Sequence, residues 1–371
     1  MPLLEIRKHW LVLLVYFTLF TAFTFALSNK ALPLVAIFEK IKWVMLIVSL
    51  PILVVSISKI AKVRITRLLI PFFIFIIFQF TSAIFISPDP FGTILKSILM
   101  LYIVYLGFFF TESNLTSISL KSVSYYFGVF CCYISILSLL STLLGVTYLS
   151  GGRLIGLLDN ANMLGALSAI GFVFLMNQTF FLKKIKYGAL ACVMIYIVYL
   201  TQSRSAIYGC LIVFIYMLIL YKYLSDLKNV LYLIVILSIF LFFYYLSQPE
   251  ITIRELSLDN RLDLFTAQLN TFYYSPWIGI GLGDDNLGYF VNLAESTYFS
   301  LLPSSGLFGT LAFISLLSMV FFTIRDALTK TIFTLICILS LSEAYLIGIG
   351  NPISIYFYLL IGSIRYLDKE G

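Results

Sequence analysis

The sequence predicts an all-α polytopic membrane protein with about twelve transmembrane helices, and three observations carry this prediction. Its 371 residues are 61% hydrophobic and only 11% charged, and the mean hydropathy is +1.04. A soluble core cannot hide so much apolar surface, so lipid is the expected solvent. The apolar residues gather in runs of helical spanning length, without the alternating strands that a membrane barrel requires.

Each run of about 20 apolar residues is one predicted span, because that length crosses a hydrocarbon core of about 30 Å. The first run is expected to remain as an anchor, since a second span follows it. No internal repeat, Ser/Gly linker or low-complexity tract divides the chain, so residues 1–371 are expected to form a single integral membrane domain. The predicted spans are 10–27, 38–58, 68–86, 93–111, 123–144, 163–181, 187–202, 205–221, 229–247, 303–324, 331–347 and 353–367.

The basic residues between the runs predict the orientation, because positive loops stay on the cytoplasmic side. With the N-terminus inside, sixteen Lys and Arg residues fall in cytoplasmic gaps and five in outer gaps. Both termini are therefore expected in the cytoplasm, and 248–296 becomes a long extracytoplasmic loop before the tenth span. The predicted orientation depends on one pair of spans being two separate helices. If 187–202 and 205–221 formed one broken helix, every later loop would change sides.

The net charge of +7 comes mainly from these loops, so it is an orientation signal and predicts no nucleic acid partner. The five cysteines lie in apolar runs without metal-ligand spacing, which predicts small buried side chains. The single histidine, His9, stands beside two basic residues at the edge of the first run. An interfacial role is expected for it rather than catalysis.

Arg153 belongs to the first of three polar segments expected on the outer face. The segment runs from Ser150 to Gly165 and opens the sixth span, and Asp159 or Asn160 is expected to cap that helix. A helix start with unpaired N–H groups can bind an anion. An interfacial arginine beside an ordinary helix cap is the alternative interpretation.

Arg204 belongs to the second segment, Thr201-Gln-Ser-Arg204-Ser205, which is a very short polar gap between two apolar runs. An arginine at membrane depth costs roughly 2.5–3.5 kcal/mol on insertion scales, so it usually faces a polar cavity or an anion. A side chain that reaches back to the interface from a tight outer turn is the alternative.

The third segment is the long loop 248–296, which contains Arg254 and Arg261. These arginines are seven residues apart, so on a helix they would share one face and could both bind a pyrophosphate. Ion pairs with nearby carboxylates are the alternative. Glu295 stands at the start of the next apolar helix. Its negative charge could interact favourably with the helix dipole there, or it could act as a general base.

Three glycines of this loop, Gly279, Gly281 and Gly283, lack the strand and helix context of a dinucleotide fingerprint. They are expected to form a tight bend or to let the backbone approach a ligand. Asp284 and Asp285 follow directly, but two adjacent carboxylates are too few ligands to predict a metal site.

Three groups of residues together resemble the O-antigen polymerase and ligase superfamily of bacterial envelope glycan assembly. The resemblance covers roughly residues 140–360, and Asn351-Pro352 before the last predicted span is also similar. The groups follow in family order, on one predicted side of the membrane. They are Gly152-Arg153 to Asn160-Ala-Asn162; Ser203-Arg204-Ser205; and Arg261 with Ser275-Pro-Trp277-Ile-Gly279-Ile-Gly281-Leu-Gly283 and Glu295-Ser-Thr-Tyr298 to Gly306-Leu-Phe-Gly309.

The resemblance implies a GT-C-like bundle with an outward-facing cavity, which works on glycans linked through pyrophosphate to a polyprenyl lipid. It implies neither a nucleotide sugar nor a metal or other cofactor. Arg204 and Arg261 correspond to arginines that bind the donor pyrophosphate, with Arg153 and Arg254 as helpers. In the ligase branch a histidine stands where this chain has Glu295, and this departure favours polymerisation over ligation to the lipid A core.

The expected function is polymerisation of lipid-linked repeat units into O-antigen, capsule or exopolysaccharide at the outer face of the bacterial cytoplasmic membrane. Glu295 is the candidate base for the acceptor hydroxyl. The candidate glycan contacts are Asn160, Asn162, Trp277 and Tyr298, although an interfacial aromatic belt would also explain the last two. The expected partners are the lipid-linked donor and acceptor and the bilayer. A chain-length regulator protein is a further candidate partner.

Other classes of function make different demands on the sequence. A ligase would transfer finished glycan to another acceptor. A lipid-linked oligosaccharide flippase would also have about twelve spans, and charges buried mid-span or two matching halves would favour it. Glu343 lies in an apolar run, but no matching halves are found. A scaffold protein would not need several arginines on one outer face.

Overall fold

The computed structural model describes residues 69–112, 120–145, 149–150, 152–158, 160–182, 185–220, 266–283, 296–348 and 351–364. Most of these residues are helical, and the β structure among them is one two-residue antiparallel ladder. The elements are α3 (Leu69–Phe85), α4 (Pro90–Glu112), α5 (Leu120–Leu143), β1 (Leu149–Ser150), β2 (Arg153–Leu154), α6 (Ala161–Leu182), α7 (Ile185–Thr201), α8 (Arg204–Leu220), α11 (Thr297–Thr323), α12 (Ala327–Leu339) and α13 (Pro352–Ser363).

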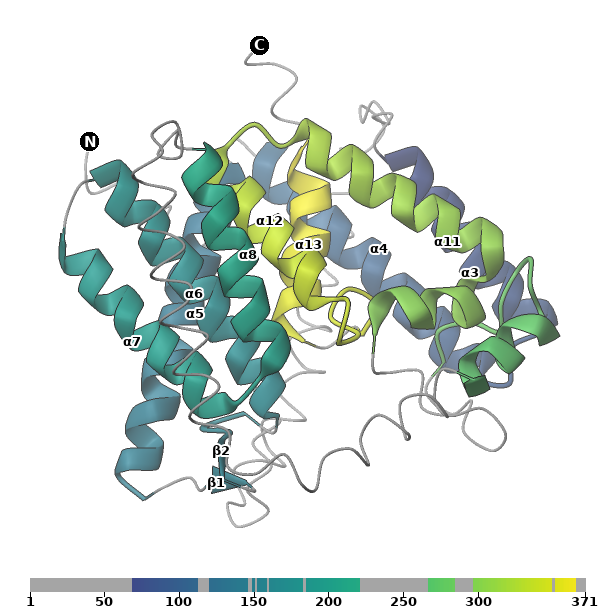
Figure 1. Cartoon of the computed structure of the whole chain (residues 1–371). Helices are drawn as coiled ribbons and strands as arrows, with labels where there is room; N and C mark the ends of the chain where they lie inside the picture. The colour runs from purple at the N-terminus through teal and green to yellow at the C-terminus, as the bar shows by residue number, and fades with distance from the viewer. Residues whose placement is uncertain are drawn as a thin grey trace.

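The helices form one bundle, in which α5 to α8 lie on one side and α3, α4 and α11 on the other (Figure 1). The helices α12 and α13 lie between the two groups, and the ladder of β1 and β2 lies at the end where α6 begins. Four helices among the described residues are long and apolar enough to cross a membrane: Pro90–Phe108, Ser122–Leu143, Ala161–Phe180 and Thr297–Thr323. Five further apolar helices are shorter.

Every predicted span that falls in the described residues contains a helix, which agrees with an all-α membrane protein. The predicted spans 10–27, 38–58 and 229–247 lie outside the described residues, so the total of twelve stays a prediction. The largest difference from a predicted boundary is at the end of the eleventh predicted span. The span expected over 331–347 is helical only to Leu339, and residues 340–348 form an irregular loop.

The break after α7 is a reversal of the chain and not a kink in one helix. Gln202 has a positive φ of 50°, which turns the backbone between α7 and α8. Close contacts of α6 with α7, the turn and α8 fix the directions: Thr179 lies against Gly188 of α7, Gly165 lies against Ser203 of the turn, and the ring of Phe172 lies 6.2 Å from that of Phe214 in α8. The helix α7 therefore runs antiparallel to α6, and α8 runs parallel to it. The two spans expected over 187–202 and 205–221 are separate helices.

Polar side chains start the two short central helices. Asp326 caps α12, because its carboxylate accepts a hydrogen bond from the Thr329 N–H at 2.9 Å. Asn351 caps α13 in the same way through Ser354 N–H at 2.8 Å, with Pro352 at the first helical position. These caps satisfy N–H groups that have no partner within the helix.

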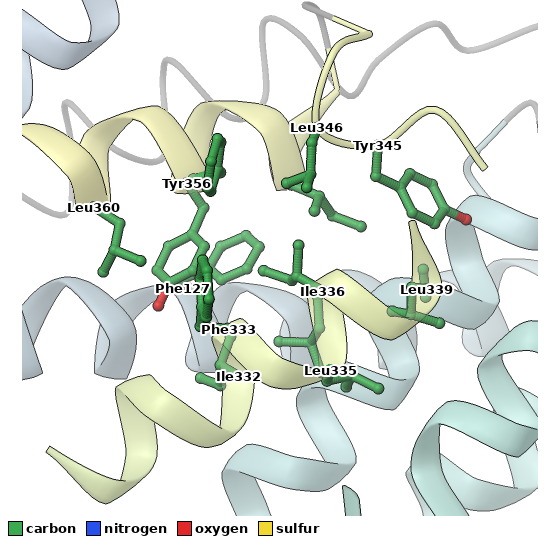
Figure 2. Close-up of a cluster of buried hydrophobic side chains, with 14 of the residues drawn as sticks. Phe127, Ile332, Phe333, Leu335, Ile336, Leu339, Tyr345, Leu346, Tyr356 and Leu360 are labelled. Carbon is green, nitrogen blue, oxygen red and sulfur yellow. The ribbon is translucent and has the colours of Figure 1, made fainter. Parts of the chain in front are cut away.

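The core around α12 and α13 combines apolar packing with a few buried hydroxyl groups (Figure 2). The rings of Phe127 and Tyr356 stack with centroids 4.2 Å apart. The Tyr356 hydroxyl and the Ser124 hydroxyl are 2.8 Å apart, and Ser124 is also 2.8 Å from the Thr329 hydroxyl. Such hydrogen bonds between buried side chains hold α5, α12 and α13 together.

The glycine-rich segment from Trp277 to Gly283 packs against a break in α11. Gly306 leaves the helical conformation with φ 62° and ψ −173°, three residues after Pro303. The neighbouring segment supplies partners for the interrupted backbone through four hydrogen bonds. These run from Ile280 N to Pro303 O, Gly281 N to Ser304 O, Leu307 N to Pro276 O, and Phe308 N to Trp277 O, at 2.9, 2.8, 2.7 and 3.4 Å.

The glycines of this segment therefore allow a close backbone contact, as the expectation of a tight bend implied. Gly279 has φ 79°, and a Cβ atom there would lie 2.5 Å from the Gly306 nitrogen. A Cβ atom at Gly306 would lie 2.4 Å from the Ile278 nitrogen. The glycines of this segment approach the backbone of α11. The segment also contacts α3, because the Ser82 hydroxyl donates a hydrogen bond to the Gly279 carbonyl at 2.9 Å.

Candidate functional site

Several element ends meet at the end of the bundle where α6, α8 and α11 begin, which we call the outer end after the predicted orientation. The ladder of β1 and β2, the turn between α7 and α8, and the 340–348 loop lie there as well. The sequence places the first two of the three predicted outer segments far apart, and the structure brings them into contact. Arg153 makes that contact.

Arg153 connects the β2 segment to two different helices. Its Nε donates to the Thr201 carbonyl at 2.8 Å, at the last residue of α7. Its Nη2 donates to the Asn162 Oδ1 at 2.5 Å, in the first turn of α6. The reversal that aims the side chain depends on Gly152, whose φ is 76°. The guanidinium is thus held in a fixed orientation by acceptors from both sides.

Asn162 connects Arg153 to Glu343, a residue that the sequence alone does not assign to the site. The Asn162 Nδ2 donates to the Glu343 Oε1 at 2.5 Å. The two residues are 181 positions apart in the chain. The only signal in the sequence was a single carboxylate within an apolar run, and it indicated a residue that must find polar partners inside the protein.

The 340–348 loop that contains Glu343 is fixed by the start of α11. The Thr297 N–H donates to the carbonyls of Ser340 and Glu343 at 3.1 and 3.2 Å, and its hydroxyl donates to the Glu343 carbonyl at 3.1 Å. The same hydroxyl accepts from the Leu346 N–H at 3.2 Å. The unpaired N–H groups of one helix start therefore satisfy the unpaired carbonyls after another helix end. This explains why an irregular loop can follow α12.

Tyr345 ties the loop to α6. It lies at the edge of the apolar cluster in Figure 2 with its hydroxyl directed out of the cluster, and that hydroxyl donates to the Asn162 carbonyl at 3.0 Å. Burial raises the pKa of Tyr345 well above its ordinary value, the Glu343 carboxylate raises it further, and Arg153 opposes the rise. The tyrosine therefore stays neutral and keeps its role as a donor.

The side chains of Asn160 and Arg204 are exposed, and both residues stand at helix starts at the outer end. The Asn160 side chain is exposed, and its Oδ1 accepts from the Asn162 N–H at 2.7 Å, so it caps α6 as one of the two expected caps. Arg204 is exposed at the first residue of α8. It follows Thr201, which binds Arg153, by three residues. Two of the four candidate pyrophosphate ligands, Arg153 and Arg204, are therefore at one end of the bundle.

The two aromatic candidates contact other described residues, Phe308 and Cys337. Trp277 is 57% exposed and stacks on Phe308, with ring centroids 5.5 Å apart. Phe308 stacks in turn on Phe78 of α3. Tyr298 is partly buried in the first turn of α11, and its hydroxyl donates to the Cys337 carbonyl near the end of α12 at 3.1 Å. Roles for both residues as glycan contacts stay predictions.

The remaining predicted site residues lie outside the described residues. They are Arg254, Arg261 and Glu295, together with Asp159, Asp284 and Asp285. Glu295 directly precedes Ser296, the N-cap of α11, so the described chain continues from it into the helix that holds the 340–348 loop. The roles expected for these residues stay predictions.

Comparison with known proteins agrees with the resemblance seen in the sequence. No curated protein matches the chain. A family model described as O-antigen ligase matches residues 189–314. The matched segment begins within α7, includes the turn with Arg204 and the contact between Trp277 and α11, and ends before α12. This match supports a function of the polymerase or ligase type in surface glycan assembly, and within residues 189–314 the chain is similar to the O-antigen ligase family.

Proposed function

We propose that the protein polymerises polyprenyl-pyrophosphate-linked oligosaccharide repeat units at the outer face of the cytoplasmic membrane. The observation that best supports this function is the cluster at the outer end. Arg153 lies there on the carbonyl of Thr201, and exposed Arg204 starts the next helix within the matched family segment. Two arginines at one end of a membrane bundle suit a substrate that carries a pyrophosphate.

The reaction joins two lipid-linked glycans. A hydroxyl of the non-reducing end sugar on the acceptor attacks the anomeric carbon of the donor chain. The bond from that carbon to the pyrophosphate oxygen breaks, with inversion, and polyprenyl pyrophosphate leaves. Arg204 and Arg261 stabilise the negative charge that develops on the leaving group, with help from Arg153 and Arg254. No nucleotide sugar takes part.

Glu295 takes the proton of the attacking hydroxyl in this proposal. A carboxylate can act as a general base when it lies within hydrogen-bond reach of that hydroxyl. Its position one residue before the cap of α11 suits this role, because Thr297 of the same helix start binds the Glu343 carbonyl at the outer end. Glu295 in place of the histidine of the ligase branch favours a polymerase.

The test uses purified protein in nanodiscs with a polyprenyl-pyrophosphate-linked repeat unit and no nucleotide sugar, with the products separated by size. A polymerase gives a ladder at repeat-unit spacing. We expect Arg261→Ala and Glu295→Gln to reduce the ladder by about 100-fold or more, as the loss of a charged contact or a base typically does.

The outcomes separate the competing functions. A single transfer to an added acceptor, without repeat-to-repeat products, would identify a ligase. Glycan that only crosses the bilayer would identify a transporter. Full ladder formation by Glu295→Gln would contradict the assignment of the base, while leaving the polymerase activity itself intact.

A further inference from the structure

The chain of contacts from Arg153 through Asn162 to Glu343 contains one residue with no role in the proposed reaction, which is Glu343. Its carboxylate lies at the outer end, in a loop whose backbone is held by Thr297. An ionised carboxylate within an apolar run is unfavourable unless polar groups pair with it, and such residues commonly belong to a functional site. Its Oε1 accepts a hydrogen bond from Asn162, and Asn162 in turn accepts one from Arg153.

The chemistry of an amide makes this arrangement directional. An ionised carboxylate can only accept hydrogen bonds, so the Asn162 amide must turn its NH₂ group toward Glu343. The oxygen of the same amide then faces the opposite way, toward the Arg153 guanidinium, which can only donate. Glu343 and Arg153 therefore favour the same orientation of the amide, in which the Asn162 oxygen faces Arg153 and Glu343 holds the opposite end.

Both ends of this chain of contacts are attached to fixed backbone. The Asn162 backbone is held in the first turn of α6 by the Asn160 cap and by the Tyr345 hydroxyl, at 2.7 and 3.0 Å. On the far side, the Arg153 Nε is held by the Thr201 carbonyl at 2.8 Å. A change in the orientation of the Asn162 amide is thus transmitted to the guanidinium and is not absorbed by backbone movement.

We infer that Glu343 is a positioning residue for the donor pyrophosphate, which acts by fixing the Asn162 amide so that Asn162 holds Arg153 in its binding orientation. The inference rests on the proposed function, because it takes the pyrophosphate as the ligand of Arg153. It assigns Glu343 no contact with the sugars and no proton transfer. An arginine that is already oriented loses less freedom when it binds a phosphate group.

The test is a charge exchange between the two partners. Asn162→Asp alone sets a second carboxylate against Glu343, and the like charges repel. In the double variant Asn162→Asp with Glu343→Gln, the new amide at position 343 donates to the new carboxylate at position 162, and that carboxylate still accepts from Arg153. Glu343→Gln alone keeps an acceptor for Asn162 but holds the amide less strongly, because a neutral amide oxygen replaces the charged carboxylate.

Two quantities are measured for each variant. The first is binding of polyprenyl pyrophosphate to the full-length protein in detergent, and the second is the KM and kcat for the lipid-linked donor. We expect Asn162→Asp to weaken binding and raise KM by about tenfold, and the double variant to return to within about threefold of wild type. The matched control is Arg325→Ala, which removes an exposed arginine at the opposite end of α11 and should bind as wild type.

A merely structural role for Glu343 gives different results. If Glu343 acts through Arg153, Glu343→Gln has no further effect on binding in an Arg153→Ala background, whereas independent effects would multiply. Independent effects, or unchanged binding in Asn162→Asp, would overturn the inference. A wild-type protein that binds polyprenyl pyrophosphate but forms no repeat-to-repeat products contradicts the proposed polymerisation and leaves the positioning role in place. A wild-type protein that does not bind the probe contradicts both.

Discussion

At the scale of single residues, two exposed arginines at opposite ends of the bundle provide a matched comparison. Arg204 begins α8 at the outer end, and Arg325 lies between α11 and α12 at the other end. Hydrogen bonds to charged groups contribute about 1.5–3 kcal/mol. We therefore expect Arg204→Ala to lower kcat/KM for the lipid-linked donor by about 10- to 100-fold, and Arg325→Ala to change it little.

Steady-state kinetics give kcat/KM for the two variants, and their thermal unfolding is measured first to confirm that both are folded. Both side chains are exposed, so neither substitution should unfold the protein. Equal loss of donor use in the two variants would show that net charge, and not a site at the outer end, governs the activity.

How much of the site could be predicted differs from residue to residue. Arg153 stands out in the sequence as a lone cation before a helix, and the structure attaches it to the turn that precedes Arg204. Asn162 is a predicted glycan contact, yet its amide binds Arg153 and Glu343. That pairing depends on a contact between α6 and a loop 181 residues later. No local pattern in one sequence encodes such a contact.

At the scale of elements, the break in α11 requires a glycine at position 306, whereas the conformation of α7 does not require one at position 188. Gly306 has φ 62°, and a Cβ atom there would lie 2.4 Å from backbone nitrogen. Gly188 lies within α7, where the nearest atom to a Cβ would be 3.7 Å away. We expect Gly306→Ala to lower the free energy of unfolding by at least about 2 kcal/mol, and Gly188→Ala to leave it unchanged or raise it by up to about 1 kcal/mol.

Thermal unfolding followed by loss of detergent-soluble protein compares these two variants directly. A Gly306→Ala protein as stable as wild type would mean that the segment from Trp277 to Gly283 does not pack on α11 as described. A strong loss in Gly188→Ala would instead indicate that α7 packs more closely than its contacts with Thr179 suggest.

The bounds of most helices followed from apolar length, because lipid leaves the backbone few alternatives to a helix. The end of α12 did not. Residues 340–347 contain no proline or glycine, so the sequence gives no local reason to stop at Leu339. The helix ends there because the first residue of α11, Thr297, supplies hydrogen bonds to the carbonyls of Ser340 and Glu343. A tertiary contact overrode the local pattern.

At the scale of the whole molecule, the reversal between α7 and α8 supports the alternation of spans on which the predicted orientation depends. Gln202 in that turn is exposed, and Lys186 near the start of α7 is exposed at the opposite end. In a variant whose five cysteines are alanine, we expect Gln202→Cys to react with a membrane-impermeant thiol reagent added to intact cells. Lys186→Cys should react only after the cytoplasmic side is opened.

The opposite pattern of labelling would invert the orientation and would move the arginine cluster to the cytoplasm. Equal labelling of the two positions from outside would mean that α7 does not cross the membrane. Either result would contradict a reaction at the outer face, because Arg153 and Arg204 both lie at the end marked by Gln202.

The most direct test of the account compares two products of the purified protein supplied with a lipid-linked repeat unit alone. These are the polyprenyl pyrophosphate released and the repeat-to-repeat linkages formed. A polymerase that uses the lipid pyrophosphate as its leaving group must release one polyprenyl pyrophosphate for each linkage, and we predict a ratio of about one throughout the reaction. Linkages without release of polyprenyl pyrophosphate, or release without linkages, would contradict the account.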